Sequence, residues 1–213
     1  MTTLSPAVPV PKRGRTLSIR LAGWLRWLHI YTSMLGLAVT LFFSVTGLTL
    51  NHPGWFWAQA ERRSVAKGEL PVEWVKADLD EEAVRKLEVV ERLRGAHGVH
   101  GALADFRAEE QDCSLTFKGP GYAADAFIDR QTGRYELTQT FYGPVAILND
   151  LHKGRDTGAV WSVLIDVSAV LLTLISLTGL ALLFYLKLRR VRGVLVGLAG
   201  ALVTLALAWW FVA

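Results

Sequence analysis

Three long apolar stretches dominate the chain, near residues 27–50, 159–186 and 193–212. A membrane helix needs about 20 apolar residues to cross a hydrocarbon core of about 30 Å, and each stretch is long enough. The segment between the first two stretches has an ordinary globular composition and carries nearly all of the acidic residues. The pattern therefore predicts a membrane α-helical protein in which three transmembrane helices enclose one extracytoplasmic domain.

Composition supports this division, since 52% of the residues are hydrophobic, which is too apolar for a soluble domain of 213 residues. The lipid bilayer is thus the first partner that the sequence implies. The boundaries that we predict are a basic tail at 1–20, transmembrane helices at 21–50, 158–188 and 189–213, and the outer domain at 51–157.

The end of the first span is marked by a helix-breaking sequence. Residues 51–54 read Asn-His-Pro-Gly, and proline disfavours helix in the residue before it. Trp55, Phe56 and Trp57 follow directly, which is typical of the aromatic belt at a membrane interface. We therefore expect the helix to stop here and the chain to leave the bilayer.

The basic residues indicate the membrane topology. The N-terminal tail holds lysines and arginines and no acid, and the link between the second and third stretches, residues 187–192, is also basic. Positively charged segments tend to stay in the cytoplasm, so we predict a cytoplasmic N-terminus and an outer domain on the opposite side. Because these charges flank membrane spans, the net charge of +4 does not indicate a nucleic-acid partner.

The outer domain shows one helical pattern and several strand patterns. Acidic residues at 80–82 begin a predicted helix that ends at Gly95. Its apolar stripe consists of Val84, Leu87, Val90 and Leu93. Alternating runs predict strands at 113–117, 124–128 and 135–140. We expect a helix packed on a small antiparallel sheet, with the single cysteine, Cys113, buried and unable to form an intramolecular disulfide.

Histidines near the ends of the spans are the first candidate site residues. His29 lies one turn into the first span on the cytoplasmic side, whereas His52 and His152 lie at the outer side. Ionisable residues in membrane helices are costly and often functional, and imidazole is a common axial ligand of haem iron. Each of these histidines has a simpler alternative role, as an interfacial residue that hydrogen-bonds water or lipid.

Two related sequences close the first and second spans. They are SVTGLTL at residues 44–50 and SLTGLAL at residues 176–182. Because the two helices run in opposite directions, Gly47 should lie near the outer face of the membrane and Gly179 near the inner face. A glycine at such a position would let a porphyrin approach the helix.

The histidines and glycines together suggest two haem b sites. The outer site would use His52 and His152 with Gly47 nearby. The inner site would use His29 beside the small-residue pair Thr178-Gly179, and its second ligand would be water, another side chain or a residue of a second protomer.

Asp166 lies about two turns into the second span, in the sequence VLIDVSAV. A carboxylate at that depth should face the helix bundle or a polar cavity. It is a candidate proton carrier, a partner for a histidine ring N–H, or a neighbour of a cofactor propionate; the alternative is an interhelical hydrogen bond to serine or threonine. His97 and His100, in AHGVHG, resemble a metal pair, but their flanking glycines favour an exposed turn.

Two segments resemble helices of the PepSY-associated transmembrane family. They are RWLHIYTSMLGLAVTLFFSVTGLTL in the first span, and LHKGRDTGAVWSVLIDVSAVLLTLISLTGLALL at the second. The outer segment, which ends in a D-x-x-T-G turn, is similar to a PepSY-like domain. The resemblance covers most of residues 24–190 and points to the short members of the family. It implies a small α+β PepSY-like domain in the periplasm and a bacterial inner-membrane location.

Larger relatives in this family include inner-membrane siderophore reductases that bind haem b and carry electrons from cytoplasm to periplasm. The resemblance implies that His29 and His152 are haem ligands, whereas His52 matches no position in the family motif. This chain is predicted to have three spans, and the larger relatives have four or more. A homodimer would restore complete haem sites.

These observations lead to two main hypotheses for function. The first is a haem b-binding inner-membrane protein that passes electrons to a periplasmic acceptor such as a ferric siderophore, which would make it a haem-dependent ferric reductase. The second is a non-catalytic, membrane-anchored accessory subunit whose PepSY-like domain binds a periplasmic partner protein. A third, proton or metal translocation through Asp166, would rely on a single intramembrane carboxylate.

Overall fold

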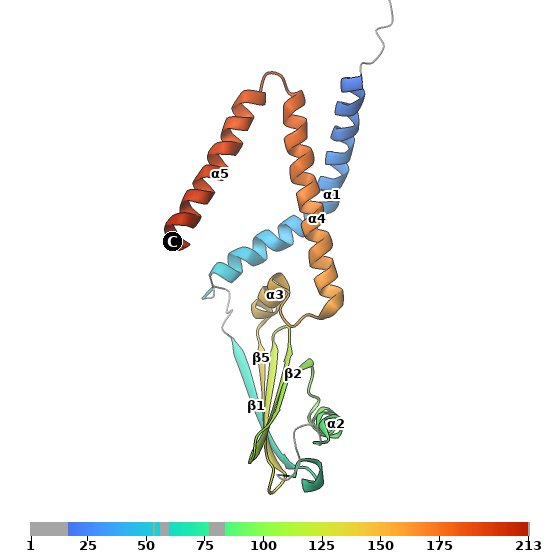
Figure 1. Cartoon of the computed structure of the whole chain (residues 1–213), viewed down its shortest axis with the longest axis vertical. Helices are drawn as coiled ribbons and strands as arrows, with labels where there is room; N and C mark the ends of the chain where they lie inside the picture. Colours follow the sequence, from blue (N-terminus) through green and yellow to red (C-terminus); the bar gives the residue numbers. More distant parts are fainter. Residues whose placement is uncertain (1–16, 53, 56–59, 77–83, 213) are drawn as a thin grey trace, which may run out of the picture. The chain divides into compact units, whose positions relative to one another are not determined.

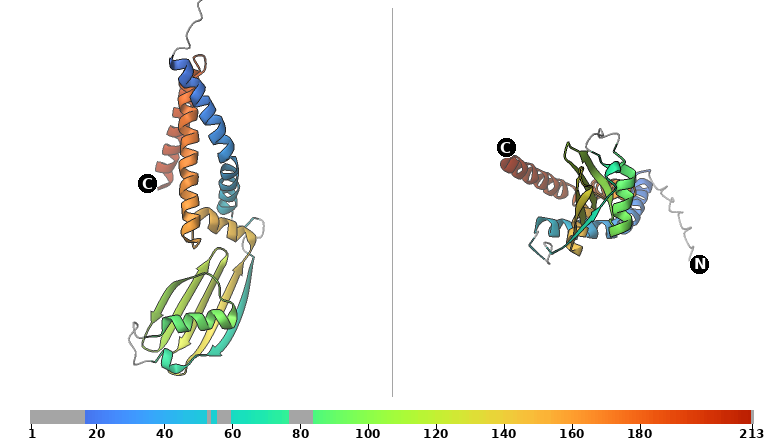
Figure 2. Two further views of the ribbon diagram at one scale, coloured as in Figure 1. Left: turned by 90° about the vertical axis from the view of Figure 1, so that its right-hand side faces the viewer. Right: turned by 90° about the horizontal axis from the view of Figure 1, so that it is seen from below.

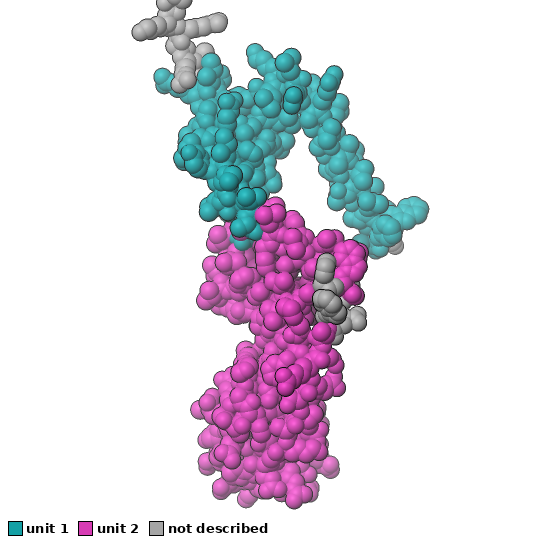
Figure 3. Space-filling model, turned by 180° about the vertical axis from the view of Figure 1, so that it is seen from behind, with its two compact units in different colours: residues 1–38, 168–213 teal, residues 39–167 magenta. Residues whose placement is uncertain are grey.

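The computed structural model describes residues 17–52, 54–55, 60–76 and 84–212. The chain divides into two compact units, which are residues 1–38 with 168–213, and residues 39–167 (Figure 3). Some predicted features lie outside the described residues: the tail as far as residue 16, the aromatic residues Phe56 and Trp57, and the acidic helix start at 80–82.

In the described part of the chain, three helices are long and apolar enough to cross a membrane, as predicted. They are α1 (Leu17–Asn51), α4 (Gly158–Tyr185) and α5 (Arg190–Val212) (Figure 1). The end of α1 at Asn51 confirms the predicted break. Within the first unit, Gly36 of α1 lies against Ile175 and Leu171 of α4, so a small residue brings these two helices close together.

A five-stranded antiparallel sheet lies between α1 and α4 in the sequence, with the strand order β1-β5-β4-β3-β2. The strands are β1 (Glu61–Glu69), β2 (Ala102–Ala108), β3 (Asp112–Gly119), β4 (Tyr122–Asp129) and β5 (Arg134–Tyr142). Strands β3, β4 and β5 confirm the three predicted runs. Alternate residues of β3 and β4 are buried, because one face of the sheet is covered and the other is open.

The two edge strands, β1 and β2, were not predicted from the sequence pattern. The sequence of β1 reads ERRSVAKGE, and most of its residues are exposed, so it shows no apolar alternation. Backbone pairing with β5 holds it along its length, from Glu61 opposite Tyr142 to Glu69 opposite Arg134. Charged side chains on an edge strand also discourage pairing with another chain.

Helix α2 (Lys86–His97) covers one face of the sheet (Figure 2). The residues that it buries are Val89, Val90 and Leu93. The predicted stripe is wrong at Leu87, which is 70% exposed. The predicted end is also wrong, because the helix continues through Gly95 to His97 and is capped by Gly98, whose φ is 62°. Glycine adopts this left-handed conformation without a Cβ penalty, so it ends helices readily.

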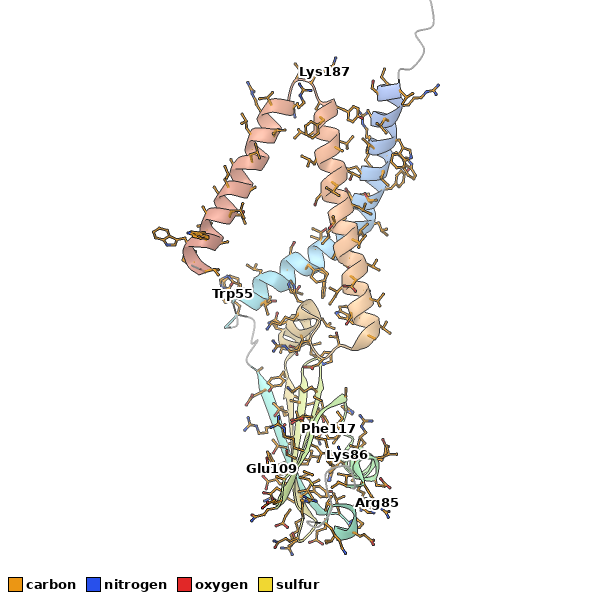
Figure 4. The ribbon with its side chains drawn as sticks, viewed as in Figure 1. Trp55, Arg85, Lys86, Glu109, Phe117 and Lys187 are labelled. Atoms are coloured by element: carbon orange, nitrogen blue, oxygen red, sulfur yellow. The ribbon has the colours of Figure 1, made fainter. Side chains whose placement is uncertain are left out.

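The core of the domain lies between α2 and the sheet. Its largest fully buried side chains include Phe117, Leu93, Leu115 and Ile128. The side chain of Phe117 on β3 lies under α2, with its ring centre 5.8 Å from the guanidinium carbon of Arg94 (Figure 4). Cys113 is buried, as predicted, and behaves as a small core residue.

One buried arginine ties the loops at one end of the domain to the sheet. Arg130 is only 3% exposed, and its guanidinium donates hydrogen bonds to three backbone carbonyls. Nε lies 2.9 Å from the oxygen of Val75 and Nη2 lies 2.6 Å from the oxygen of Lys76, while Nη1 donates to Glu109. These bonds fix the turn after the short 3₁₀ helix η1 (Val72–Trp74) and the turn between β2 and β3.

A short helix that was not predicted, α3 (Pro144–Lys153), connects β5 to α4 (Figure 1). Proline begins the helix, where its missing N–H has no cost, and Gly154 ends it with a φ of 66°. Asp150 accepts a hydrogen bond from the backbone N–H of Gly121 at 2.9 Å, and Ile147 packs against Gly121. Helix α3 is therefore tied to the turn between β3 and β4.

Candidate functional site

His152, near the C-terminal end of α3, contacts the last turns of α1. Its Nδ1 lies 2.7 Å from Oγ1 of Thr46, which is 2% exposed. A Cβ added to Gly47 would lie 3.3 Å from Cε1 of the imidazole. The ring of Phe43 meets the imidazole edge-on, with 5.2 Å between centres. The half-buried ring is thus held by a threonine, a glycine and an aromatic residue of one helix.

His29 in α1 has nearly the same surroundings in the other unit. Its Nδ1 lies 2.9 Å from Oγ1 of Thr178 in α4, and Thr178 is 6% exposed. A Cβ added to Gly179 would lie 3.1 Å from Cε1 of the imidazole. The chain therefore repeats one local arrangement, in which a Thr-Gly dipeptide of a membrane helix receives a histidine ring.

Further contacts fix the helix that carries His152. Thr49 of α1 donates a hydrogen bond to Oδ1 of Asn149 at 2.9 Å, one turn away from His152. The indole of Trp161 in α4 donates to the carbonyl of Leu151 at 2.8 Å. These bonds connect α3 to α1 on one side and to the start of α4 on the other. The position of the imidazole is thus determined by contacts from three helices.

The repeated arrangement coincides with the segments that carry the family resemblance. A comparison with protein families matches residues 23–213 to one family. The chain belongs to the PepSY_TM-like family. Comparisons with curated proteins and with solved structures give no match. The family assignment confirms the resemblance seen in the sequence and covers both histidine sites of this PepSY_TM-like protein.

The structure brings together some of the predicted site residues and separates others. It pairs His152 with Gly47, and His29 with Gly179. In each pair the glycine lies against the imidazole ring, whereas the sequence predicted that it would face a porphyrin. His52 does not join the outer pair. Its ring instead stacks on Trp55, with 4.0 Å between centres and 9° between planes. The helix break directly after Asn51 explains this placement, because His52 lies beyond the last helical turn.

Asp166 is exposed on α4 in the single chain, and its expected place facing a helix bundle or a polar cavity stays a prediction. The preceding residue, Ile165, lies against Gly154. Consecutive side chains of a helix point about 100° apart, so the side chain of Asp166 points away from this contact. Among the described residues Asp166 makes no hydrogen bond or ion pair. One ring nitrogen of His29 and one of His152, Nδ1 in each case, is bonded to a threonine and not to this carboxylate.

His97 and His100 are not brought together as a metal pair. Nε2 of His97 lies 2.7 Å from the hydroxyl of Tyr135, whereas the exposed ring of His100 lies against Tyr122. Burial raises the pKa of the Tyr122 hydroxyl. In the described part of the PepSY_TM-like protein, no group of three or more histidine, cysteine or acidic side chains is placed to hold a metal ion.

The hydrogen-bonding role of the threonines and the helix α3 are the site features that were not predicted from the sequence. The glycines of the two related sequences were the predicted site residues, yet the residue before each glycine, Thr46 or Thr178, makes the hydrogen bond. The signal was present, because the dipeptide Thr-Gly occurs in both sequences. The sequence carries a signal for α3, with Pro144 at its start and Gly154 after its end, but it does not show that this helix turns His152 back towards α1.

Proposed function

We propose that this PepSY_TM-like protein binds haem b through His29 and His152 and passes electrons to an acceptor such as a ferric siderophore. One observation carries the proposal. Each imidazole is half-buried among membrane helices and is held through Nδ1, while Nε2 has no hydrogen-bond partner in the described part of the chain. Coordination of iron by Nε2 would therefore break no hydrogen bond of the described chain.

The available side chains suit a haem better than a metal ion that protein ligands alone would hold. A porphyrin supplies four nitrogens, so haem iron takes only axial ligands from the protein. A bare metal ion would require several convergent side chains, and the described residues contain no such group. Haem, when bound, supplies one-electron redox chemistry.

The residues of the chain would orient the ligands and exclude water. The Thr-Gly dipeptides hold each ring at a fixed distance from its helix, and Phe43 covers one edge of His152. Each site offers one imidazole from the described residues. A second copy of the chain would supply a further ligand for each haem, so the proposal includes a homodimer.

The charge pattern supports a membrane topology for the proposed electron transfer. The basic segments before α1 and between α4 and α5 favour a cytoplasmic N-terminus in a bacterial inner membrane. His29 would then be the ligand nearer the cytoplasm, and His152 would be nearer the periplasm. The sheet domain would lie in the periplasm, where a ferric chelate could meet it.

The test is a reduced-minus-oxidised absorption spectrum of the full chain purified in detergent, with haem measured per chain. We expect a b-type signal that is reduced in His29→Ala and in His152→Ala. The matched control is His100→Ala, which removes an exposed imidazole of the sheet domain. A colourless protein from cells with ample haem would refute the proposal.

A second candidate is a membrane-anchored accessory subunit that binds a partner protein. The open face of the sheet favours it, because Phe127 on β4 is 63% exposed and Val65 on β1 is 53% exposed. A photo-crosslinker placed at Phe127 should then give one discrete adduct in cells. The same probe at Leu87, which is exposed on α2, should give none. A colourless protein with this adduct would favour the second candidate over the first.

A further inference from the structure

The hydroxyl groups of the two site threonines are already committed to their own helices. Thr46 donates to the carbonyl of Phe42 at 2.6 Å, and Thr178 donates to the carbonyl of Leu174 at 2.7 Å. Threonine commonly bonds the carbonyl four residues earlier in a helix. A hydroxyl has one hydrogen and two lone pairs, so each threonine can act towards its histidine only as an acceptor.

The donor of each histidine–threonine bond must therefore be the ring. We infer that each threonine is a positioning residue, which holds its histidine in the tautomer that carries the hydrogen on Nδ1 and a lone pair on Nε2. The pairs are Thr46 with His152, and Thr178 with His29. This inference concerns the protein without any cofactor, and its consequence for haem binding rests on the proposed function.

The contact with threonine is the hydrogen bond that fixes each ring. In the described part of the chain no hydrogen bond forms at Nε2 of either imidazole. The orientation of each ring nitrogen is therefore set by its threonine.

The glycines complete the arrangement by setting the distance. A Cβ at Gly47 or at Gly179 would press on Cε1, the ring carbon between the two nitrogens. With glycine, the ring approaches the helix closely enough for Nδ1 to reach the threonine oxygen. The threonine thus selects the nitrogen that carries hydrogen, and the glycine permits the approach.

The consequence is that both sites present the same ring nitrogen as a ligand. Only a nitrogen with a lone pair binds a metal, and the hydrogen bond at the other nitrogen decides which one that is. Loss of such a supporting hydrogen bond typically lowers metal affinity by roughly 10–100-fold. Loss of the hydroxyl group of Thr46 or of Thr178 should therefore lower the affinity for haem by a factor of this size.

The first experiment needs no cofactor. Haem-free full chain, labelled with ¹⁵N-histidine and held in detergent, reports the hydrogen on each ring nitrogen through its nitrogen chemical shifts. We expect the Nδ1–H tautomer at both histidines in the wild type. An Nε2–H tautomer, or a mixture of the two, would overturn the inference without any variant being needed.

Variants then separate a positioning role from a structural one. In Thr46→Val the tautomer preference of His152 alone should be lost, and in Thr178→Val that of His29 alone. Thr46→Ser and Thr178→Ser keep the hydroxyl and should restore the preference. The matched control is Thr204→Val, because Thr204 donates to the carbonyl of Gly200 in α5 and is exposed. Unchanged tautomers in both site variants would overturn the inference.

Haem titration distinguishes this inference from the proposed function. We expect the valine variants to bind haem roughly 10–100-fold more weakly and the serine variants to bind it like the wild type. Equal haem binding by the wild type and the valine variants would refute the claim that the threonines strengthen haem binding. It would leave the proposed function standing. A protein that binds no haem but shows the expected tautomers would refute the proposed function and leave the inference about the tautomers standing.

Discussion

The imidazole of His29 lies so close to Gly179 that a methyl group on the glycine would sit 3.1 Å from Cε1 of the ring. We predict that Gly179→Ala shifts the ring by a few tenths of an ångström and that Gly179→Leu displaces it. Overpacking of this kind typically costs about 1–3 kcal/mol. The measurement is the ¹⁵N spectrum of His29 together with haem content.

The control for this series is Gly197→Leu in α5. A Cβ at Gly197 would meet nothing within 4 Å, so the same change of size should leave His29 unaffected. A graded loss from alanine to leucine at Gly179, with no change in the control, would establish that close contact is what matters. Equal tolerance at both glycines would contradict the prediction.

Arg130 should be among the most sensitive positions of the sheet domain. In Arg130→Met, three backbone carbonyls lose their donor, and we expect a loss of about 3 kcal/mol in local stability. Arg130→Lys should recover only part of this, because one ammonium cannot reach carbonyls in the fixed geometry of a guanidinium. Hydrogen–deuterium exchange of β3 and β4 amides in the full chain measures the effect.

Arg134→Lys is the matched control, because Arg134 pairs with Glu69 at the surface and is 74% exposed. Exposed ion pairs contribute about 0–1 kcal/mol, so exchange should hardly change. Comparable destabilisation by the two lysine substitutions would contradict the prediction that the hydrogen bonds of Arg130 to three backbone carbonyls stabilise the domain.

Two glycines of the sheet domain should respond to alanine in opposite directions. Gly68 on β1 packs under the Tyr135 hydroxyl group, so Gly68→Ala must push that ring away from its hydrogen bond with His97. We expect a cost of about 1–3 kcal/mol. Gly95 lies inside α2 with nothing within 4 Å of an added Cβ, and Gly95→Ala should stabilise the helix by about 0.5–1 kcal/mol.

Exchange protection of α2 and β1 amides distinguishes the two outcomes. Protection of α2 should rise in Gly95→Ala, and protection of β1 should fall in Gly68→Ala. Destabilisation by Gly95→Ala would mean that Gly95 has a role as a helix end, which the continuous helix to His97 does not support.

The turn after β4 should make the domain sensitive to acid. The backbone N–H of Thr132, with smaller contributions from its side chain and from the N–H of Gln131, holds the pKa of Asp129 below its ordinary value of 3.8. Because the folded pKa is the lower one, the stabilisation is complete above the ordinary value. It is lost as the pH falls through the folded pKa.

A carbon-detected NMR titration of Asp129 in the full chain measures this pKa directly. Asp129→Asn provides the comparison, since it keeps an acceptor oxygen and removes the charge. The difference in exchange protection between the two proteins should shrink as the pH falls below the ordinary aspartate pKa of 3.8. A difference that grows in acid would contradict the assigned sign.

The sequence predicted the features that follow from long-range composition or strict periodicity. The three spans depend on apolar length, and strands β3, β4 and β5 depend on alternation over a buried face, so both were recognisable. Strand β1 was not, because its backbone is held by β5 while its side chains stay exposed. The end of α2 was misplaced because Gly95 and Gly98 look alike in sequence, and only the φ of Gly98 reveals the true end.

The site was predicted in part for the same reason. His29, His152 and the two glycines carry recognisable chemistry, whereas pairing across 149 and 106 residues depends on how the helices meet. The placement of His52 could not be foreseen, because stacking on Trp55 is decided by the local path of the chain after α1.

Helix α3 has a practical consequence for anyone who wishes to study the sheet domain in water. The same ten residues present Asp150 to the β3–β4 turn and His152 to the membrane helix. A fragment that stops before Pro144 leaves the turn at Gly121 without its cover of Ile147. A fragment that runs on to Lys153 brings the surface that contacts α1 into solution. Soluble truncations should therefore aggregate or fray at this end, and the domain is best prepared with its membrane helices attached.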